Sequence, residues 1–287
     1  DLNEGNYNNT VSKGKFAGFA ETNRQTVGGN PAGLDYIKYL GFTHVQIQPV
    51  LDFDSKDDIK TSDWYNWGYD TLSFFALEGS YALHPEVPAS RILEFKSMVN
   101  KYHENDLRII MDVVYNHIYE YENSDFEKTV PHYYFRRRRN HYLSNASGCG
   151  NDFASERKMA SKIIVDSVKY LFKYFDIDGL RFDLMGLLDI NTVKACYKEA
   201  RKIKDDAILY GEGWDMGEEL PSEEKASKNN AALLKEFGFF NDSYRDIVKG
   251  PSSSFNLHEK GYICGNTDYV YGLDYAFHAS VLPLSYQ

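Results

Sequence analysis

Three short segments place carboxylates beside cationic or aromatic residues at spacings that suit acid–base chemistry. They are residues 112–117 (DVVYNH), 179–183 (GLRFD) and 211–215 (GEGWD). Arg181 and Asp183 are two residues apart, so on a strand their side chains share a face. The guanidinium is then expected to keep Asp183 ionised, as a nucleophile requires.

Glu212 lies one strand–helix–strand unit beyond Asp183, so its strand is expected to be the immediate neighbour. Neighbouring strands lie about 4.8 Å apart, which would place the two carboxylates roughly 5 Å from each other. That separation is typical of a retaining glycosidase rather than an inverting one. Contact with Trp214 would raise the pKa of Glu212 and keep it protonated as the general acid.

Each segment also has a simpler interpretation. A single Asp at a strand end is often a helix cap, an Arg-x-Asp pair is often a structural ion pair, and residues 116–117 can simply end a strand. A carboxylate-based hydrolase is the first candidate. Metal-dependent chemistry is the second, with Asp112, His117, Asp183 and Glu212 as ligands. Against a metal stands the lack of His-x-x-x-His or paired-cysteine spacing.

The elements that must position these residues alternate between strand and helix patterns. Strands are predicted at 43–50, 108–114, 177–183, 207–211 and, more weakly, 237–241. Helices are predicted at 31–40, from an N-cap at Ser90 to about His103, at about 156–175, and from Asn191 or Thr192 onward. The apolar stripes of the second and third helices are expected to include Leu93 and Met159.

This alternation predicts parallel strand–helix–strand units in either an open sheet or a closed barrel. No Gly-x-Gly-x-x-Gly and no phosphate-binding loop opens a helix, so a nucleotide-binding open sheet loses support. The barrel is therefore the leading fold, and its active site is expected at the carboxyl ends of the strands. Two polar, aromatic excursions, 51–88 and 118–154, interrupt the alternation. The run 136–139 (RRRR) in the second is expected to be a solvated loop face, and a glycan-facing or protein-docking patch is the alternative.

Composition excludes several classes of protein. The 287 residues carry 42 Asp and Glu against 32 Lys and Arg, which argues against nucleic-acid and anionic-membrane partners. No 18-residue apolar run is present, and three distant cysteines form neither a disulfide framework nor a paired-thiol metal site. The 23 Tyr, 18 Phe and 3 Trp favour a carbohydrate ligand. No signal peptide is predicted, and a secreted, cell-surface or cytoplasmic location stays open.

Taken together and in this order, the three segments resemble conserved regions of the α-amylase superfamily of retaining glycoside hydrolases. Residues 65–70 (YNWGYD), followed by 78–81 (EGSY), resemble the signature of type I pullulanases, which cut α-1,6 branches. Residues 46–53 and 150–157 are similar to further pullulanase stretches. The resemblance implies an eight-stranded TIM-type (β/α)8 barrel, incomplete in this chain, with residues 1–287 covering about strands 2 to 6.

The resemblance also implies roles for individual residues. Asp183 is the expected nucleophile, Glu212 the acid and then the base, and Arg181 the residue that orients Asp183. The expected substrate contacts are His117, Tyr69 beneath the sugar, Asp70, Trp214 on the acceptor side, Asn151 and Met185. For Met185 the alternative is a core-filling position.

No cofactor is expected to be required. In many members of the superfamily the position of Asn116 is a calcium ligand, and a structural hydrogen bond is the alternative here. The expected partners are an α-glucan and other segments or domains of the parent chain.

One feature of the superfamily is missing. It uses a second Asp, preceded by His, at a later strand, and this sequence contains no His-Asp dipeptide. Residues 1–14 are polar, and about five of eight strands are predicted. The sequence is therefore expected to be cut from a longer enzyme and to be inactive in isolation. The rival functions are an α-1,4-acting amylase-like or neopullulanase-like hydrolase and a non-catalytic glucan-binding fragment.

Overall fold

The computed structural model describes residues 12–54, 58–59, 65–251 and 258–278. The chain divides into two compact units, 1–238 and 239–287, which are described separately. The prediction for residues 1–11 lies outside the described residues.

The sheet has the strand order β1–β2–β3–β4–β5, and the pairs β1–β2, β2–β3 and β3–β4, all in the first unit, are parallel. The strands are β1 (His44–Ile47), β2 (Arg108–Val113), β3 (Gly179–Phe182), β4 (Ile208–Gly211) and β5 (Gly238–Phe239). The helices of this unit are α1 (Phe16–Phe19), α2 (Leu34–Tyr39), α3 (Pro88–His103), α4 (Asp125–Thr129), α5 (Lys158–Phe175) and α6 (Ile190–Ile203). Its 3₁₀ helices are η1 (Gly79–Tyr81), η2 (Met185–Leu187), η3 (Ser222–Glu224) and η4 (Lys228–Leu233). Each predicted strand is present, and the parallel pairing confirms the predicted strand–helix–strand units.

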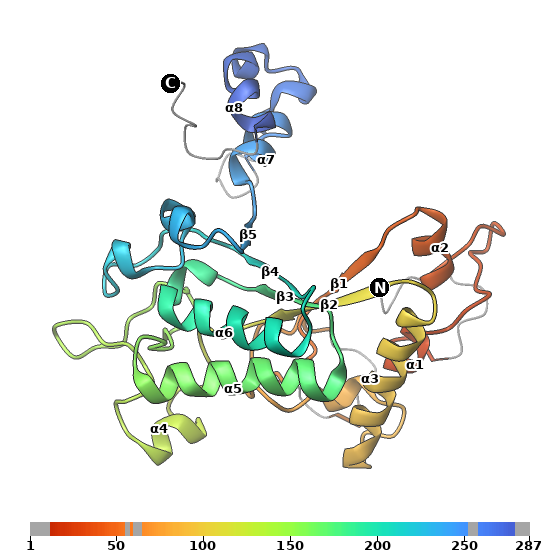
Figure 1. Ribbon diagram of the computed structural model, residues 1–287, viewed down its shortest axis with the longest axis horizontal. Helices are drawn as coiled ribbons and strands as arrows, with labels where there is room; N and C mark the ends of the chain where they lie inside the picture. Colours follow the sequence, from red (N-terminus) through yellow and green to blue (C-terminus); the bar gives the residue numbers. More distant parts are fainter. Residues whose placement is uncertain (1–11, 55–57, 60–64, 252–257, 279–287) are drawn as a thin grey trace. The chain divides into compact units, whose positions relative to one another are not determined.

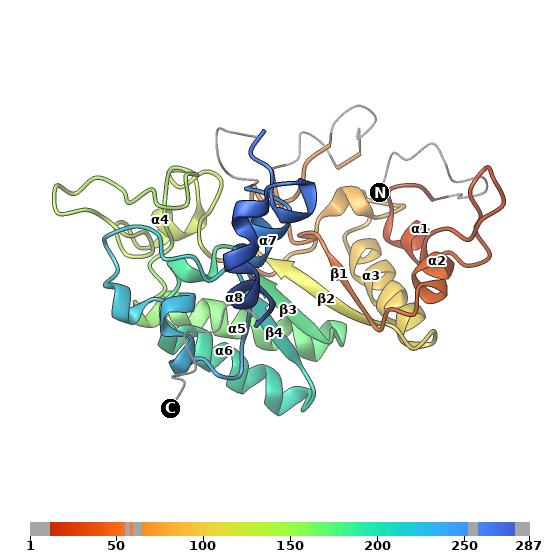
Figure 2. The same ribbon diagram turned by 90° about the horizontal axis from the view of Figure 1, so that it is seen from above.

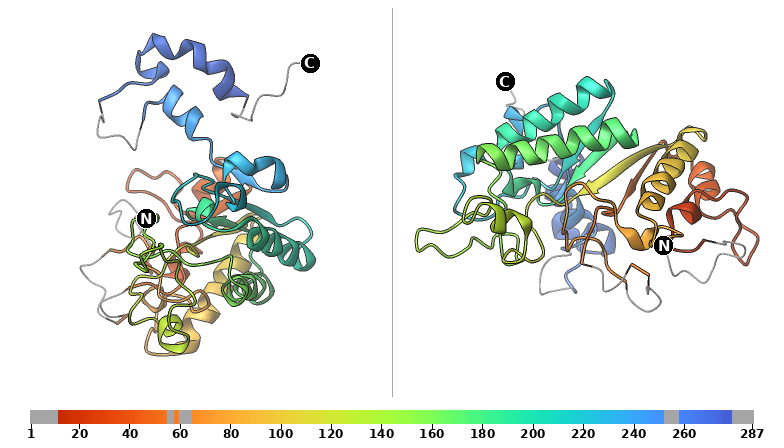
Figure 3. Two further views of the ribbon diagram at one scale, coloured as in Figure 1. Left: turned by 90° about the vertical axis from the view of Figure 1, so that its left-hand side faces the viewer. Right: turned by 90° about the horizontal axis from the view of Figure 1, so that it is seen from below.

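Apolar periodicity explains the layering. α5 and α6 pack side by side over one face of the sheet (Figures 1 and 3). Leu171 and Phe172 of α5 are buried, as are Leu180 and Phe182 of β3. Phe182 contacts the ring of Tyr115, whose hydroxyl lies 2.8 Å from Ser167 of α5, so Phe182 points into the strand–helix layer.

The sheet is strongly curved. Tyr210 on β4 donates a hydrogen bond to Gln46 on β1, although two strands separate them in the sheet. In a flat sheet two strands so far apart would be roughly 14 Å from each other, beyond the reach of one hydrogen bond. The inner face therefore bends as the wall of a barrel does.

One predicted helix start was wrong. α3 begins at Pro88 rather than after Ser90, because proline favours the first helical position and needs no hydrogen-bond acceptor for its nitrogen. α6 begins at Ile190, one residue before the predicted Asn191, because Asp189 caps it by accepting from the N–H of Thr192.

Three side chains also differ from prediction. Leu93 and Met159 are exposed by 64% and 43%, so the buried stripes of α3 and α5 are narrower than expected. Arg136 is buried rather than solvated, since its guanidinium donates to the carbonyl of Leu187 and pairs with Glu156 at 2.7 Å. Arg138 and Arg139 are exposed, as predicted.

The two excursions carry little regular structure. The first contains the antiparallel bridges Leu51–Leu77 and Phe53–Thr71. The second contains α4 and lies beyond the arrowhead end of β2 (Figure 2). Both excursions therefore follow the carboxyl ends of strands.

The second unit is helical where it is described. It contains α7 (Asp242–Val248), α8 (Leu273–Phe277) and the 3₁₀ helices η5 (Tyr262–Cys264) and η6 (Thr267–Gly272). Tyr244 of α7 and Phe277 of α8 pack edge to face. Within the described part of the chain, no helix has both the length and the apolar character needed to cross a bilayer.

Candidate active site

Ion pairs join the carboxyl ends of β2, β3 and β4 around Arg181. Its Nη1 donates to Asp112 at 2.8 and 3.0 Å and to Asp183 at 2.9 Å, while its Nη2 donates to Glu212. Since one guanidinium holds both Asp183 and Glu212, the two bonded oxygens lie within about 8 Å of each other. Burial opposes the charge of Arg181, but the three carboxylates outweigh it and raise the pKa of the guanidinium, which stays charged.

Asp183 is almost completely buried and firmly oriented. Its Oδ2 accepts from the side-chain amide of Asn116 at 2.8 Å, and its Oδ1 accepts from Arg181. Its backbone N–H donates to the carbonyl of Val113 at 3.0 Å. Both carboxylate oxygens are therefore held in place, as an attacking nucleophile requires.

Glu212 is hydrogen-bonded to the turn that follows β3. Its Oε2 accepts from the N–H of Leu184 at 3.1 Å, and its carbonyl accepts from Gly186 at 2.9 Å. Leu184 has φ 41° and ψ 45°, a left-handed conformation that costs a leucine about 1 kcal/mol or more. That strained turn aims the N–H of Leu184 at Glu212. The predicted desolvation of Glu212 by Trp214 stays a prediction.

His117 and Asn116 form one hydrogen-bonded unit beside Asp183. His117 Nδ1 lies 2.6 Å from Asn116 Oδ1, and the same Asn116 amide donates to Asp183. Burial lowers the pKa of His117, although the charge of Asp183 acts to raise it. His117 is therefore a neutral hydrogen-bonding group at pH 7.

Tyr69, which lies in the first excursion, contacts the same group of residues around Arg181. Its hydroxyl donates to Asp112 at 2.8 Å, and its ring centroid lies 5.9 Å from the Arg181 guanidinium carbon. Gly68, at φ 88°, allows this approach, because a Cβ there would collide with the carbonyl oxygen of Pro49. Asp70 accepts from Asn66 at 3.0 Å. Tyr69 is thus fixed against the charged centre.

Asp112 also belongs to this hydrogen-bonded group, whereas the sequence interpretation considered it only as a metal ligand. It is fully buried and pairs in register with Arg181 on the next strand. Burial raises the pKa of Asp112 to about 7, and the hydrogen bonds from Arg181 and Tyr69 oppose this rise. The signal that marks such a residue is a carboxylate inside an otherwise apolar strand.

Other predicted substrate contacts have structural partners. Met185 is fully buried and its sulfur packs against the backbone of Gly211, which supports the core-filling alternative and argues against substrate contact. Both ends of the Asn151 side-chain amide bond to the backbone of Ile118, so Asn151 joins the two ends of the second excursion. Trp214 is half-buried, and its carbonyl faces Gly186.

The calcium site stays a prediction. Calcium binds oxygen ligands, and the side-chain oxygen of Asn116 lies 2.6 Å from His117 Nδ1. Among the residues with described positions, no group of three or more His, Cys, Asp and Glu side chains is arranged to hold a metal ion.

Comparisons with known proteins agree with this geometry. A family model described as the catalytic domain of alpha amylase matches residues 16–147. A pullulanase of Bacillus subtilis (strain 168) is 50% identical over 256 residues, which are 89% of this chain and 35% of that protein.

Two solved structures also match. One is a type I pullulanase from Bacillus subtilis str. 168 complexed with maltose, with TM-score 0.90, 48% identity, and coverage of 93% of this chain and 37% of that one. The other is a pullulanase from Anoxybacillus sp. LM18-11 complexed with maltotriose, with TM-score 0.92, 45% identity, and coverage of 95% and 39%. The chain thus spans little more than a third of the length of these relatives.

Sequence, fold and site geometry agree, and they confirm the resemblance noted from the motifs. The parallel strands are those of part of a (β/α)8 barrel. The chain belongs to the type I pullulanase group of the α-amylase superfamily.

Proposed function

We propose that this chain supplies the catalytic centre of a retaining hydrolase that cleaves α-1,6 links in branched α-glucans. The observation that carries the proposal is that Arg181 holds Asp183 and Glu212 together at the ends of adjacent parallel strands. The names of the relatives, which are pullulanases, support the α-1,6 specificity.

The proposed reaction is a double displacement. Asp183 attacks the anomeric carbon and forms a β-glycosyl ester, while Glu212 gives its proton to the departing 6-oxygen. Glu212 then takes a proton from water, the hydroxyl adds to the anomeric carbon, and Asp183 is released. Two inversions leave the product with the α configuration of the substrate.

The proposed substrates are pullulan, amylopectin, glycogen and limit dextrins. Solved relatives carry maltose, maltotriose and maltotetraose, which are α-glucan oligosaccharides. Tyr69 offers an aromatic face at the charged centre, as a sugar ring requires. The proposed partners within the protein are the other segments of the parent chain.

Pullulan digestion separates this function from an α-1,4-acting rival. We expect the full-length protein to release maltotriose from pullulan, because cleavage of every α-1,6 link leaves maltotriose units. Release of panose, measured by chromatography of the digest, would instead assign α-1,4 cleavage. Binding of pullulan without any new reducing ends would support a non-catalytic glucan-binding protein.

A further inference from the structure

We propose that Lys225 is a positioning residue that holds residues 213–217, and with them Trp214, on the side of the site where the leaving sugar binds. This inference rests on the proposed function, since it concerns how the same site receives its substrate. Glu212 is the proposed donor of a proton to the departing 6-oxygen, so the residues that directly follow Glu212 lie next to the departing sugar. Lys225 does not act on the substrate itself; it acts through that segment.

The side chain of Lys225 is almost completely buried, and its ammonium group contacts that segment. Its Nζ donates to Asp215 Oδ1 at 2.6 Å and to the carbonyl oxygen of Gly217 at 2.6 Å. The other carboxylate oxygen of Asp215 accepts from the side-chain amide of Asn229 at 3.1 Å. The hydrogen bond from Lys225 lowers the pKa of Asp215, which is therefore charged at pH 7. A buried lysine is tolerated only where its charge is paired and hydrogen-bonded, and these contacts meet that condition.

The backbone around Lys225 is itself fixed to the rest of the first unit. Ala226, the next residue, donates its N–H to the carbonyl oxygen of Leu188 at 2.8 Å, just before α6 begins. Lys228 donates its N–H to the carbonyl oxygen of Gly213 at 2.7 Å, which closes the base of the loop that starts at Gly213. Lys225 is therefore an anchored cation inside this loop, and its ammonium group ties the two halves of the loop together.

The proposed acid is held by other contacts. Glu212 Oε2 accepts from the N–H of Leu184 at 3.1 Å, and Glu212 Oε1 accepts from Arg181. Loss of the Lys225 ammonium group should therefore displace Trp214 more than the carboxylate of Glu212. The loss of activity is expected on substrates that place a sugar on the leaving side of the site, and not on substrates that lack one.

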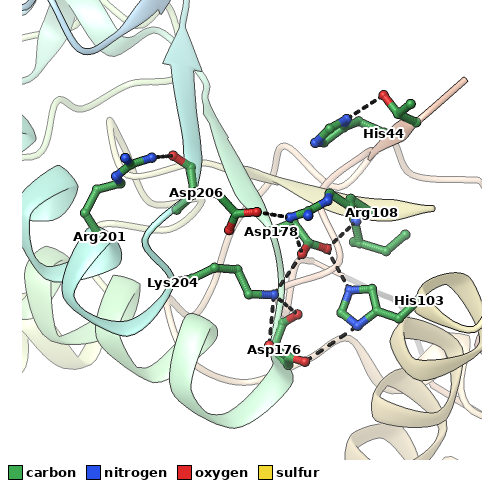
Figure 4. Close-up of polar contacts among 11 residues, drawn as sticks. His44, His103, Arg108, Asp176, Asp178, Arg201, Lys204 and Asp206 are labelled. Carbon is green, nitrogen blue, oxygen red and sulfur yellow. Dashed lines mark hydrogen bonds and ion pairs between the residues drawn. The ribbon is translucent and has the colours of Figure 1, made fainter. Parts of the chain in front are cut away.

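The experiment compares Lys225→Met and Lys204→Met with the wild type in the full-length protein. The substrates are pullulan and α-maltotriosyl fluoride, whose leaving group is a fluoride ion rather than a sugar, and the assays run well below the melting temperature of every variant. Lys204 is the matched control, because its ammonium group also pairs with a buried carboxylate, that of Asp178 at 2.8 Å, but at the amino end of the sheet (Figure 4). Lys225→Met should lower kcat/KM for pullulan at least about tenfold and leave kcat/KM for the fluoride within about twofold of the wild type. Lys204→Met should leave both values within about twofold.

Asp215→Asn is a second variant, which removes the same ion pair at its more exposed partner, since the side chain of Asp215 is 25% exposed. It should show the same selective loss on pullulan. Combining it with Lys225→Met should add little to the larger single effect, because the two residues act through one contact.

Equal losses on both substrates would overturn the inference, as would a kcat/KM of Lys225→Met on pullulan within about twofold of the wild type. A crystal structure of Lys225→Met in which residues 213–217 keep their positions would also overturn it; a displaced segment is the expected result. The structural readout needs no substrate. A wild type that leaves both pullulan and the fluoride intact would therefore count against the proposed function and not against the role of Lys225.

Discussion

The charge balance at Arg181 explains why this group of residues suits glycoside cleavage. Three carboxylates, Asp112, Asp183 and Glu212, contact a single guanidinium. The surplus of acidic groups gives the centre negative character, which favours the positive charge that develops on the sugar in an oxocarbenium-like transition state. A proton on Glu212 reduces the surplus and is the proton that the first step consumes.

Substrates with different leaving groups distinguish the proposed acid, Glu212, from the proposed nucleophile, Asp183. Glu212→Gln should lose several orders of magnitude of kcat on pullulan, whose 6-oxygen must be protonated as it leaves. On α-maltotriosyl fluoride, whose leaving group needs no proton, the same variant should form the glycosyl-enzyme almost as fast as the wild type. Asp183→Asn should lose several orders of magnitude of kcat on both substrates and still bind pullulan.

Single-turnover fluoride release and calorimetric binding of pullulan provide these measurements. Near-normal hydrolysis of pullulan by Asp183→Asn would remove its assignment as the nucleophile. Equal losses on both substrates for Glu212→Gln would remove its assignment as the acid.

The turn between β3 and η2 contains Asp183, and its backbone is hydrogen-bonded to Glu212. Leu184 donates its N–H to the Glu212 side chain, and Gly186 donates to the Glu212 backbone. A Cβ on Gly186 would collide with the carbonyl oxygen of Trp214. The segment from Glu212 to Trp214 is therefore placed by direct backbone contact with this turn.

Gly186→Ala should displace that segment and lower kcat on pullulan by about tenfold or more, with a lower melting temperature. Gly28→Ala is the matched control, because a Cβ there would meet atoms only at 3.8 and 3.9 Å. Kinetics and thermal unfolding of both variants test this. A Gly186→Ala protein that behaves like Gly28→Ala would show that the contact has no influence on Glu212.

Sequence patterns predicted the strands well because a buried strand has a local signature. The run before Asp112 is apolar, and its strand lies within one residue of the prediction. The errors have non-local causes. Arg136 was expected in solvent since a run of four arginines suggests it, but its partners Glu156 and Leu187 are 20 and 51 residues away. The contacts of Asp112 depend likewise on two other segments of the chain, which supply Tyr69 and Arg181.

The first unit has its proposed catalytic charges and its stabilising charges at opposite ends of the parallel strands. The proposed catalytic group lies at the carboxyl ends, where the active sites of such barrels lie. At the amino ends, Asp178 joins the end of α3 through His103 to the end of α6 through Lys204 (Figure 4). It also accepts from the backbone N–H of Ile109 at 2.8 Å. One buried carboxylate thus joins three elements that are far apart in the sequence.

Asp178→Asn should lower the free energy of unfolding by about 3 kcal/mol at pH 7, since it removes the buried carboxylate that pairs with Lys204 and contacts His103. Burial alone would raise the pKa of Asp178, but bonds from Lys204, His103 and Ile109 outweigh it and hold the pKa below its ordinary value. Because the folded pKa is the lower one, this stabilisation is complete above the unfolded pKa of about 4 and is lost as the pH falls through the folded value.

Urea unfolding of the full-length protein at pH 7 and pH 3 should therefore show a large difference between variant and wild type at pH 7 and a smaller one at pH 3. Asp206→Asn, which removes an exposed partner of Arg108, should cost under about 0.5 kcal/mol at either pH. Equal effects of the two substitutions at pH 7 would show that the buried network does not hold the helices to the sheet.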